Sequence, residues 1–171
     1  MNLWDKLQLK IVTKDLAKTL ISAWKEAGEN VVFTNGCFDI LHRGHVTYLA
    51  KAASCGDYLV IGLNTDASVK RQGKGADRPI NEETSRALVL AALECVDLIV
   101  LFEEDTPLNI INELQPNVVV KGADYDADET NPASKKYIVG SKEVKALGGE
   151  VFTIELEEGF STTAIVDRLK G

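Results

Sequence analysis

The stretch VVFTNGCFDILHRGHVTYLA, residues 31–50, decides how this chain is expected to fold. Its apolar, β-branched opening at 31–34 indicates a buried strand, and Asn35-Gly36 is typical of the turn that ends one. A helix is expected over about 43–54, so the tetrapeptide His42-Arg43-Gly44-His45 falls at a helix N-terminus. The stretch therefore predicts a strand, a glycine-bearing loop and the start of a helix in direct succession.

Both histidines of the chain lie in this tetrapeptide. Free backbone N–H groups and the positive end of the helix dipole meet at a helix N-terminus, which makes it a natural site for an anion. Side chains three residues apart project from the same side of a helix, so His42 and His45 are expected to face one ligand. Gly44 has no side chain to block a close approach to the backbone. The pattern predicts a phosphate site.

Two other roles for the histidines are open alternatives. A zinc pair is disfavoured, because the zinc-protease pattern is His-Glu-x-x-His and the chain has no further histidine as a third ligand. Two structural histidines, one of them capping the helix, are the second alternative. Cys37 is a conceivable nucleophile, but it needs a partner base and a lowered pKa, and the histidines are better used on phosphate.

Composition bounds the class of protein. The chain has 171 residues, of which 45% are hydrophobic and 26% are charged, as in one globular domain. No apolar run reaches the ~18 residues of a membrane-spanning helix, and the N-terminus lacks the parts of a secretory signal. Cys37, Cys55 and Cys95 are odd in number and widely spaced, which is typical of reduced thiols. We expect a cytoplasmic protein without a membrane partner.

The charge pattern bears on whether the phosphate ligand is a nucleic acid or a smaller molecule. A net charge of −7 argues against nucleic acid as a partner, because nucleic-acid binding usually needs an extended basic surface. Cations are concentrated locally instead, as Lys70, Arg71, Lys74 and Arg78, with only Asp77 opposing them. A solvated basic loop is the alternative to a phosphate-binding role for this segment.

Strand and helix patterns alternate along the chain. Continuous β-branched runs separated by amphipathic helices indicate a parallel sheet covered on both faces. We therefore predict one α/β domain, three-layered and Rossmann-like, with about five strands, preceded by a helical extension over 1–29 that packs on or beside it. Strands are expected at 31–34, 58–63, 98–102, 118–120 and 151–154, and helices at 14–27, 43–54, 82–93 with Asn81 as cap, 108–114, 141–148 and 162–169 with Ser161 as cap.

In a sheet of this kind ligands bind beyond the carboxyl ends of the strands. That edge is expected to carry four loops, at 36–45, 64–78, 121–124 and 159–163, with 64–78 as a long polar loop. Other phosphate and metal motifs are absent from the sequence: there is no Walker loop and no Gly-x-Gly-x-x-Gly. The acidic run 124–128 begins like a calcium loop but lacks its glycine and its final Glu.

Two segments resemble the signatures of a known family. Residues 34–45, TNGCFDILHRGH, resemble the first signature of the cytidylyltransferase-like nucleotidyltransferases, whose shared element is His-x-Gly-His. Residues 159–163, GFSTT, resemble their second, a Ser-Thr-Thr that opens the last helix. Segments 62–71, 78–81 and 118–125 are similar to one branch, the D-glycero-β-D-manno-heptose 1-phosphate adenylyltransferases. The resemblance covers about residues 12 to 170.

The resemblance implies a reaction and a set of site residues. A sugar 1-phosphate would attack the α-phosphorus of ATP and release pyrophosphate, with Mg²⁺ carried by the triphosphate and no protein metal ligand identified. Arg86 points to the phosphates in this account, and a surface ion pair with Glu82 or Glu83 is its alternative. The implied catalytic residues are His42, His45, Lys70, Arg71, Ser161 and Thr162; the nucleotide contacts are Thr34, Asn35, Gly36, Cys37, Phe38, His42, Gly44, His45, Arg86, Lys121, Gly122, Ser161, Thr162 and Thr163; the substrate contacts are Asp39, Asp66, Lys74, Arg78, Asp124 and Tyr125.

The resemblance also implies a biological setting. Many members carry this domain fused behind a heptose kinase; here a separate kinase is expected, and the product would serve lipopolysaccharide core or another surface glycan. Relatives are often dimers, and the N-terminal segment with Trp4 and Trp24 is either an interface or packed on its own sheet. Two other functions stay open, a cytidylyltransferase for glycerol 3-phosphate or a similar small phosphate, and a nucleotide-sensing domain without catalysis.

Overall fold

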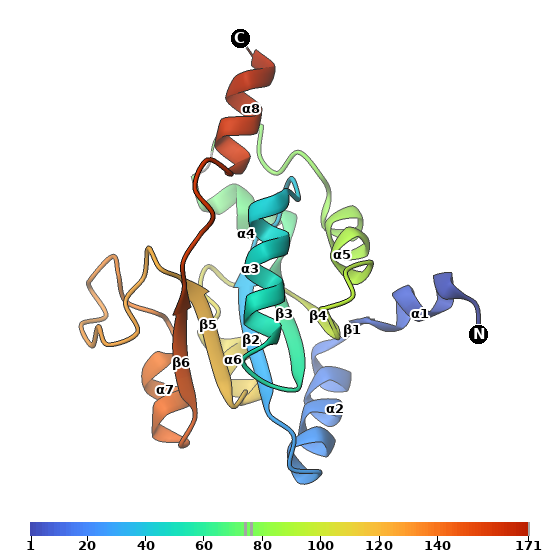
Figure 1. Cartoon of the computed structure of the whole chain (residues 1–171), viewed down its shortest axis with the longest axis vertical. Helices are drawn as coiled ribbons and strands as arrows, with labels where there is room; N and C mark the ends of the chain where they lie inside the picture. Colours follow the sequence, from blue (N-terminus) through green and yellow to red (C-terminus); the bar gives the residue numbers. More distant parts are fainter. Residues whose placement is uncertain (74, 76, 171) are drawn as a thin grey trace.

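The computed structural model describes residues 1–73, 75 and 77–170, so the predicted substrate residue Lys74 lies outside the described residues. The described chain forms a six-stranded sheet with helices on both faces (Figure 1). The strands are β1 (Ile11–Val12), β2 (Val31–Gly36), β3 (Tyr58–Asn64), β4 (Leu98–Phe102), β5 (Val118–Gly122) and β6 (Glu150–Ile154). The helices are α1 (Leu3–Leu9), α2 (Lys14–Glu26), α3 (Arg43–Ala53), α4 (Asp66–Arg71), α5 (Glu83–Ala91), α6 (Leu108–Leu114), α7 (Ser141–Ala146) and α8 (Thr162–Lys170).

The sheet has the strand order β1-β4-β3-β2-β5-β6, and every pair is parallel. From β2 the chain adds β3 and β4 on one side and then crosses to add β5 and β6 on the other. The order therefore reverses between β2 and β5, and a crevice opens beyond their carboxyl ends, where open parallel sheets bind ligands. Residues Asn35 and Gly36 at the end of β2, and Lys121 and Gly122 at the end of β5, border this point.

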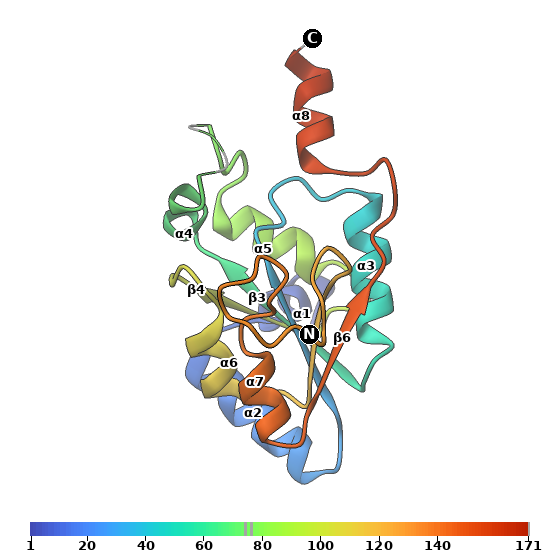
Figure 2. The same ribbon diagram turned by 90° about the vertical axis from the view of Figure 1, so that its left-hand side faces the viewer.

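Two apolar layers hold the helices to the sheet, as the continuous β-branched strands predicted. On one face α2, α6 and α7 pack on the sheet, and on the other α3 and α5 do, with α1 beside α5 (Figure 2). The first layer is centred on residues such as Ile21, Phe33 and Ile111, and the second on Leu49, Ile61 and Leu90. The predicted three-layer α/β fold is confirmed, with six strands instead of about five.

The extra strand and an extra helix correct the sequence prediction. β1 contributes only two residues, which pair with β4 at the sheet edge, and a two-residue strand leaves no periodic pattern to detect. The segment 64–78, expected as a polar loop, contains α4. Its N-cap is Thr65, whose Oγ1 accepts a hydrogen bond from the Ser68 N–H at 3.3 Å.

Helix caps were predicted with mixed success. Thr13 caps α2 as expected, because its Oγ1 accepts from the Leu16 N–H at 3.3 Å. The predicted cap Asn81 is wrong: α5 has Glu82 as its N-cap, and the Asn81 amide instead donates to the Asp39 carbonyl at 2.6 Å. The Asn81 side chain therefore binds a carbonyl 42 residues away in the sequence instead of capping the helix that follows it.

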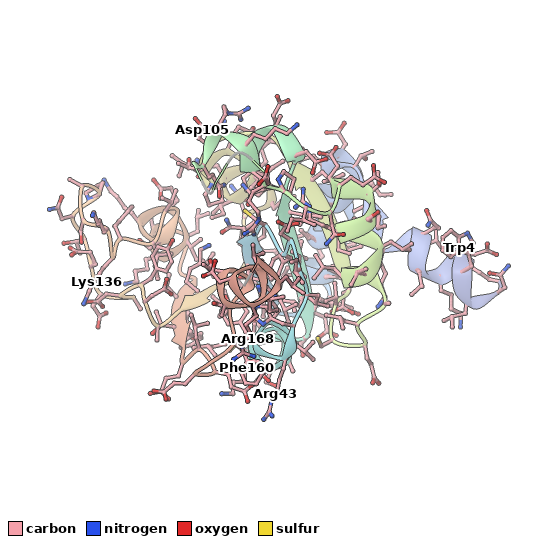
Figure 3. All side chains as sticks on the ribbon, turned by 90° about the horizontal axis from the view of Figure 1, so that it is seen from above. Trp4, Arg43, Asp105, Lys136, Phe160 and Arg168 are labelled. Atoms are coloured by element: carbon pink, nitrogen blue, oxygen red, sulfur yellow. The ribbon has the colours of Figure 1, made fainter. Side chains whose placement is uncertain are left out.

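Both ends of the chain extend from the body of the domain. α1 projects at the side of the sheet edge, where the indole of Trp4 stands at the outer end (Figure 3). Trp24 belongs to the interior packing instead, because its ring stacks on Tyr58 with 3.9 Å between centroids. α8 extends beyond the carboxyl edge of the sheet (Figures 1 and 2). Within the described chain, no helix has the length and apolar character needed to cross a membrane.

Candidate active site

A cavity of about 530 Å³ lies at the carboxyl edge of the sheet. All four loops that the sequence placed at this edge contribute to its wall, for example through Cys37, Gln72, Gly122 and Phe160. The long connection between β5 and α7 closes one side with Tyr125 and Tyr137. The predicted convergence of four loops is therefore confirmed.

A second cavity, of about 350 Å³, adjoins the first and shares Cys37, Phe38 and His45 with it. Its remaining wall comes from Asp39 and Arg78 and from Thr162 and Thr163 at the start of α8. The N-termini of α3 and α8 thus face the same region, and helix N-termini favour negative charge.

The two histidines are stacked at the start of α3. His42 is the N-cap residue, and its ring lies 3.9 Å from that of His45 between centroids, with 25° between the planes. The prediction that both rings project from one side is confirmed. Burial lowers the pKa of His42, which favours the neutral imidazole. Nδ1 of His42 is buried and has no hydrogen-bond partner within the described residues.

Gly44 leaves room for two close neighbours at the start of α3. A Cβ on Gly44 would lie 3.1 Å from ring atoms of His42 and 3.1 Å from the Cβ of Phe160. The glycine therefore lets the ring of His42 and the loop before α8 both approach the helix.

Phe38 supports the pair from the loop after β2. Its ring meets His45 edge-on, with 5.3 Å between centroids and 63° between planes. Phe38 has φ +45°, in the left-handed region that a bulky residue rarely adopts. A Cβ on Gly36 would lie 2.9 Å from the Phe38 ring, so any larger residue there would displace that ring.

Asp39 lines the smaller cavity and also anchors two loops of the site. Its carboxylate is buried, pairs with Arg78, and accepts from the N–H groups of Ile80 and Asn81 at 2.9 Å each. Desolvation raises the pKa of Asp39, but the hydrogen bonds from Asn81, Ile80 and Arg78 outweigh it and leave the pKa below its ordinary value. The predicted substrate contacts Asp39 and Arg78 therefore join two loops of the site to each other.

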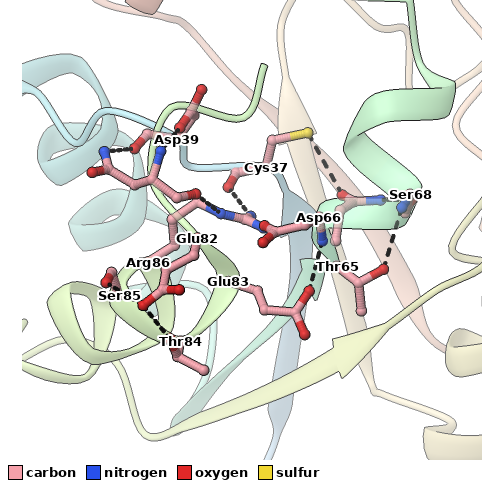
Figure 4. Close-up of polar contacts among 12 residues, drawn as sticks. Cys37, Asp39, Thr65, Asp66, Ser68, Glu82, Glu83, Thr84, Ser85 and Arg86 are labelled. Atoms are coloured by element: carbon pink, nitrogen blue, oxygen red, sulfur yellow. Dashed lines mark hydrogen bonds and ion pairs between the residues drawn. The ribbon is translucent and has the colours of Figure 1, made fainter. Parts of the chain in front are cut away.

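Arg86 is buried as well, and the structure shows neither its predicted contact at the ligand site nor its predicted surface ion pair. The surface ion pair with Glu82 or Glu83 is wrong, because the guanidinium pairs with Asp66 at 2.7 Å (Figure 4). It also donates to the carbonyls of Cys37 at 2.6 Å and Asn81 at 3.0 Å. Arg86 does not line the two cavities, and Asp66, predicted to face the substrate, accepts from Arg86 instead.

Other predicted residues take up places around the main cavity. Lys121 donates to the Asn35 carbonyl at 3.2 Å, which bridges the ends of β5 and β2, and lies 5.5 Å from the Tyr125 ring. Cys37 Sγ donates to the Gln72 amide oxygen at 3.2 Å. Thr34 is the exception, because it is fully buried and hydrogen-bonded to the Tyr48 hydroxyl at 2.8 Å. Asn35, Gly36, Gly44, Gly122, Asp124 and Tyr125 line the cavity.

The predicted cations Lys70 and Arg71 do not reach either cavity wall. Lys70 is exposed, and the Arg71 guanidinium donates to Asp105 at 2.7 Å and to the Glu103 carbonyl. Ser161 is exposed and caps α8 as predicted, because its Oγ accepts from the Ala164 N–H at 3.0 Å. Of the second signature, Thr162 and Thr163 line the smaller cavity together with His45.

Sequence reasoning missed two residues that shape the site. Glu157 fastens the loop before α8 to α3, through Arg43 at 2.7 Å and the Thr47 hydroxyl at 2.8 Å. Arg43 also lies 5.4 Å from the Phe160 ring, and both are labelled in Figure 3. Tyr48 lines the cavity and donates to the Val120 carbonyl at 3.0 Å. The helical spacing of Tyr48 and Ala52, both buried, is a signal that could have found Tyr48, whereas Glu157 carries no local signal.

Comparison with known proteins places this geometry in a family. The family model described as "Cytidylyltransferase-like" matches residues 33–168. The chain belongs to the cytidylyltransferase-like family. This match, which spans both signatures and the two cavities, confirms the predicted nucleotidyltransferase assignment at the level of the cytidylyltransferase-like family.

Curated relatives of this cytidylyltransferase-like chain are longer proteins. The "Bifunctional protein HldE" of Nitrobacter hamburgensis is 55% identical over 159 residues, which are 93% of this chain and 30% of that protein. The protein of the same name from Wolinella succinogenes is 49% identical over 96% of this chain and 32% of its own length. The chain thus spans about a third of the curated relatives it matches.

Solved structures agree with the family fold. A lipopolysaccharide core biosynthesis protein from Thermoplasma volcanium is 28% identical, with a TM-score of 0.57, over 76% of this chain and 98% of that one. A pantoate-beta-alanine ligase from Francisella tularensis, 13% identical, aligns with a TM-score of 0.59 over 94% of this chain and 76% of its own. The second likeness concerns the fold alone.

Proposed function

We propose that this chain transfers the adenylyl group of ATP to D-glycero-β-D-manno-heptose 1-phosphate and forms ADP-heptose and pyrophosphate. One observation carries the proposal: His45, stacked on His42, lines a cavity that Thr162 and Thr163 at the N-terminus of α8 also line. The relatives named HldE, about half identical over most of the chain, favour this reaction over the alternatives. The similar protein from Thermoplasma volcanium, which is named for lipopolysaccharide core biosynthesis, supports the same use.

The proposed step is an in-line displacement at phosphorus. An oxygen of the sugar 1-phosphate forms a bond to the α-phosphorus of ATP, and the bond from that phosphorus to the bridging oxygen of the β-phosphate breaks. The attacking phosphate is already an anion at neutral pH, so positioning and charge stabilisation matter more than a general base. The electron pair of the broken bond leaves with pyrophosphate, which gains negative charge.

The start of α3 is suited to that charge. The imidazoles of His42 and His45 donate N–H groups to the α-phosphate and the leaving group, beside the free N–H groups of the helix. On the other side, Ser161, Thr162 and Thr163 bring the N-terminus of α8 to the triphosphate. Two helix N-termini and two histidines therefore surround the bond that breaks.

The larger cavity holds the nucleoside and the sugar in this proposal. The ends of β2 and β5, with Gly36, Lys121 and Gly122, border the nucleoside, where the reversal of strand order opens the sheet. Asp124 and Tyr125 offer a carboxylate and a hydroxyl to hydroxyl groups of ribose or heptose. In this proposal Arg71 exchanges its partner Asp105 for a phosphate, and the exposed Lys70 is a second cation beside it.

Mg²⁺ enters the proposal as the counterion of ATP. Among the residues that the structure describes, no three or more His, Cys, Asp or Glu side chains are gathered as a possible metal cage. These residues do not fit a resident metal site, so phosphate oxygens and water would supply the ligands.

The setting of the reaction is also part of the proposal. The sugar 1-phosphate has to come from a sugar kinase, and ATP as donor places the step in the cytoplasm. The exposed helix α1 with Trp4, 56% exposed, is the surface proposed for a homodimer. ADP-heptose would then be consumed by a glycosyltransferase that builds lipopolysaccharide core or another surface glycan.

Pyrophosphate release tests the proposal against its alternatives. ATP and CTP are each combined, with Mg²⁺, with heptose 1-phosphate, glycerol 3-phosphate or no acceptor. Release only with ATP and heptose 1-phosphate, slowed ~10²–10³-fold in His45→Ala, is the expected result. Release with CTP and glycerol 3-phosphate would move the chain to the cytidylyltransferase alternative. ATP binding without release for any pair would favour the sensing domain.

A further inference from the structure

We infer that Arg86 is a positioning residue, which orients the imidazole of His45 through the Cys37–Phe38 segment. The structural part of this inference stands alone, and its effect on catalysis rests on the proposed role of His45 at the phosphates. Arg86 lines neither of the two cavities at the carboxyl edge and borders a separate cavity of only about 80 Å³ beside Phe38 and Asp39, so in this inference it acts on the site through other residues.

The guanidinium of Arg86 is held from three sides. Its side chain has no exposed surface, and it contacts the Asp66 carboxylate and the carbonyls of Cys37 and Asn81, at 2.7, 2.6 and 3.0 Å. Burying a cation is costly unless it is paired and hydrogen-bonded, and the planar fork of arginine meets three acceptors at once. Three loops that surround the site therefore meet at this one side chain (Figure 4).

The carbonyl that Arg86 binds directly precedes a strained residue. Phe38 has φ +45°, and a bulky side chain keeps such a conformation only when its surroundings over-determine it. Arg86 fixes the carbonyl of Cys37 before it. The Asn81 amide fixes the carbonyl of Asp39 after it, at 2.6 Å. The left-handed turn at Phe38 is thus clamped on both sides by residues 81–86.

The strained residue in turn contacts the catalytic pair. The Phe38 ring meets His45 edge-on, and His45 stacks on His42. If the Cys37–Phe38 peptide relaxes toward an ordinary φ, the Phe38 ring must leave this position and the His45 ring loses its support. The path of contact therefore runs from Arg86 through the Cys37 carbonyl and the Phe38 ring to His45.

The chain offers a direct readout, because it contains only two histidines. A carbon–proton correlation spectrum of the imidazole Cε1–H groups therefore has two signals, assigned with His42→Asn. In Arg86→Met, we expect the His45 signal to move as it does in Phe38→Leu. We also expect kcat to fall by about 10² with a smaller change in the KM for ATP, as a small displacement of a catalytic group does.

The control separates positioning from mere loss of stability. Ile21→Ala removes a buried side chain of α2 on the opposite face of the sheet, and it should lower Tm while leaving both histidine signals in place. Arg86→Lys keeps the charge and one donor and serves if Arg86→Met does not fold; its His45 signal should also move. Histidine signals at their wild-type positions in the Arg86 variants, with a lowered Tm as in Ile21→Ala, would overturn the inference. The spectrum needs no substrate, so a wild-type chain without turnover would count against the proposed reaction alone.

Discussion

The imidazole rings of His42 and His45 lie face to face, with 3.9 Å between their centroids. Two imidazolium cations at this distance would repel each other, so the stack favours the neutral form of at least one ring. Burial acts in the same direction on His42 by lowering its pKa. A neutral ring still donates one N–H, which is what a developing phosphate charge requires.

The first prediction concerns pH and stability. Burial lowers the pKa of His42 below its ordinary 6.5 in the folded chain. Between that lowered pKa and about 6.5 the unfolded chain binds more protons, so the free energy of unfolding rises with pH in this window and levels off above it. Urea unfolding between pH 4.5 and 8 measures the slope. His42→Asn should remove this part of the slope, and an unchanged slope in that variant would contradict the prediction.

The second prediction concerns His45. Removing one preorganised donor at a developing oxyanion typically costs ~10²–10³ in rate, and we expect His45→Ala to lower kcat by that factor. ATP binding, measured by calorimetry, should weaken far less, because the charge that His45 meets develops in the transition state. An equal loss in binding and in kcat/KM would instead make His45 a simple ATP contact.

Gly44→Ala is the third prediction, and it separates activity from stability. Alanine is favoured over glycine within a helix by about 1 kcal/mol. Its Cβ would nevertheless lie 3.1 Å from the His42 ring and from Phe160 Cβ, so both must shift by a few tenths of an ångström. We expect kcat to fall at least tenfold with Tm kept within a few degrees. Retained kcat would show that the close approach at Gly44 is irrelevant to the chemistry.

The fourth prediction concerns the buried carboxylate of Asp39. Removing one partner of a buried ion pair costs about 3–5 kcal/mol, so Asp39→Ala should lose that much stability at pH 7. Because hydrogen bonds hold the folded pKa of Asp39 below its ordinary 3.8, its contribution is present above about pH 4 and lost as the pH falls through the lower folded value. Chemical unfolding at pH 7 and pH 2.5 tests both statements.

A matched control for Asp39 is Asp128, whose side chain is 99% exposed and lies 4.0 Å from Lys145. Asp128→Ala should change the stability by less than about 0.5 kcal/mol at either pH. A similar loss in both variants would mean that the burial of Asp39 does not matter.

Local patterns were sufficient for the layers of the fold. The β-branched runs at 31–34 and 118–120 were found as β2 and β5, and the tetrapeptide from His42 to His45 was correctly placed at the start of α3. These features depend on residues that are close in sequence, so periodicity and capping rules can predict them. β1 was not predicted, because Ile11 and Val12 form a strand only by pairing with β4.

The polar framework of the site could not be predicted in the same way. Asp39, Asp66 and Arg86 were expected at the ligand. The structure pairs Asp39 with Arg78 and Asp66 with Arg86, and of these three residues Asp39 lines the smaller cavity. Asp39 meets Asn81 from 42 residues away, and the Arg86 nitrogen that contacts Cys37 spans 49 residues. The sequence does not distinguish a carboxylate that binds a ligand from one that pairs with a buried arginine. The partner is determined by the tertiary structure.

The central claim is the transfer of an adenylyl group to a sugar 1-phosphate, and label transfer tests it most directly. The chain is incubated with Mg²⁺, ATP labelled at the α-phosphate, and heptose 1-phosphate, and the products are separated. We predict that the label appears in ADP-heptose, with one pyrophosphate released for each molecule formed. Label that remains in ATP, or that appears only as AMP, would contradict the account.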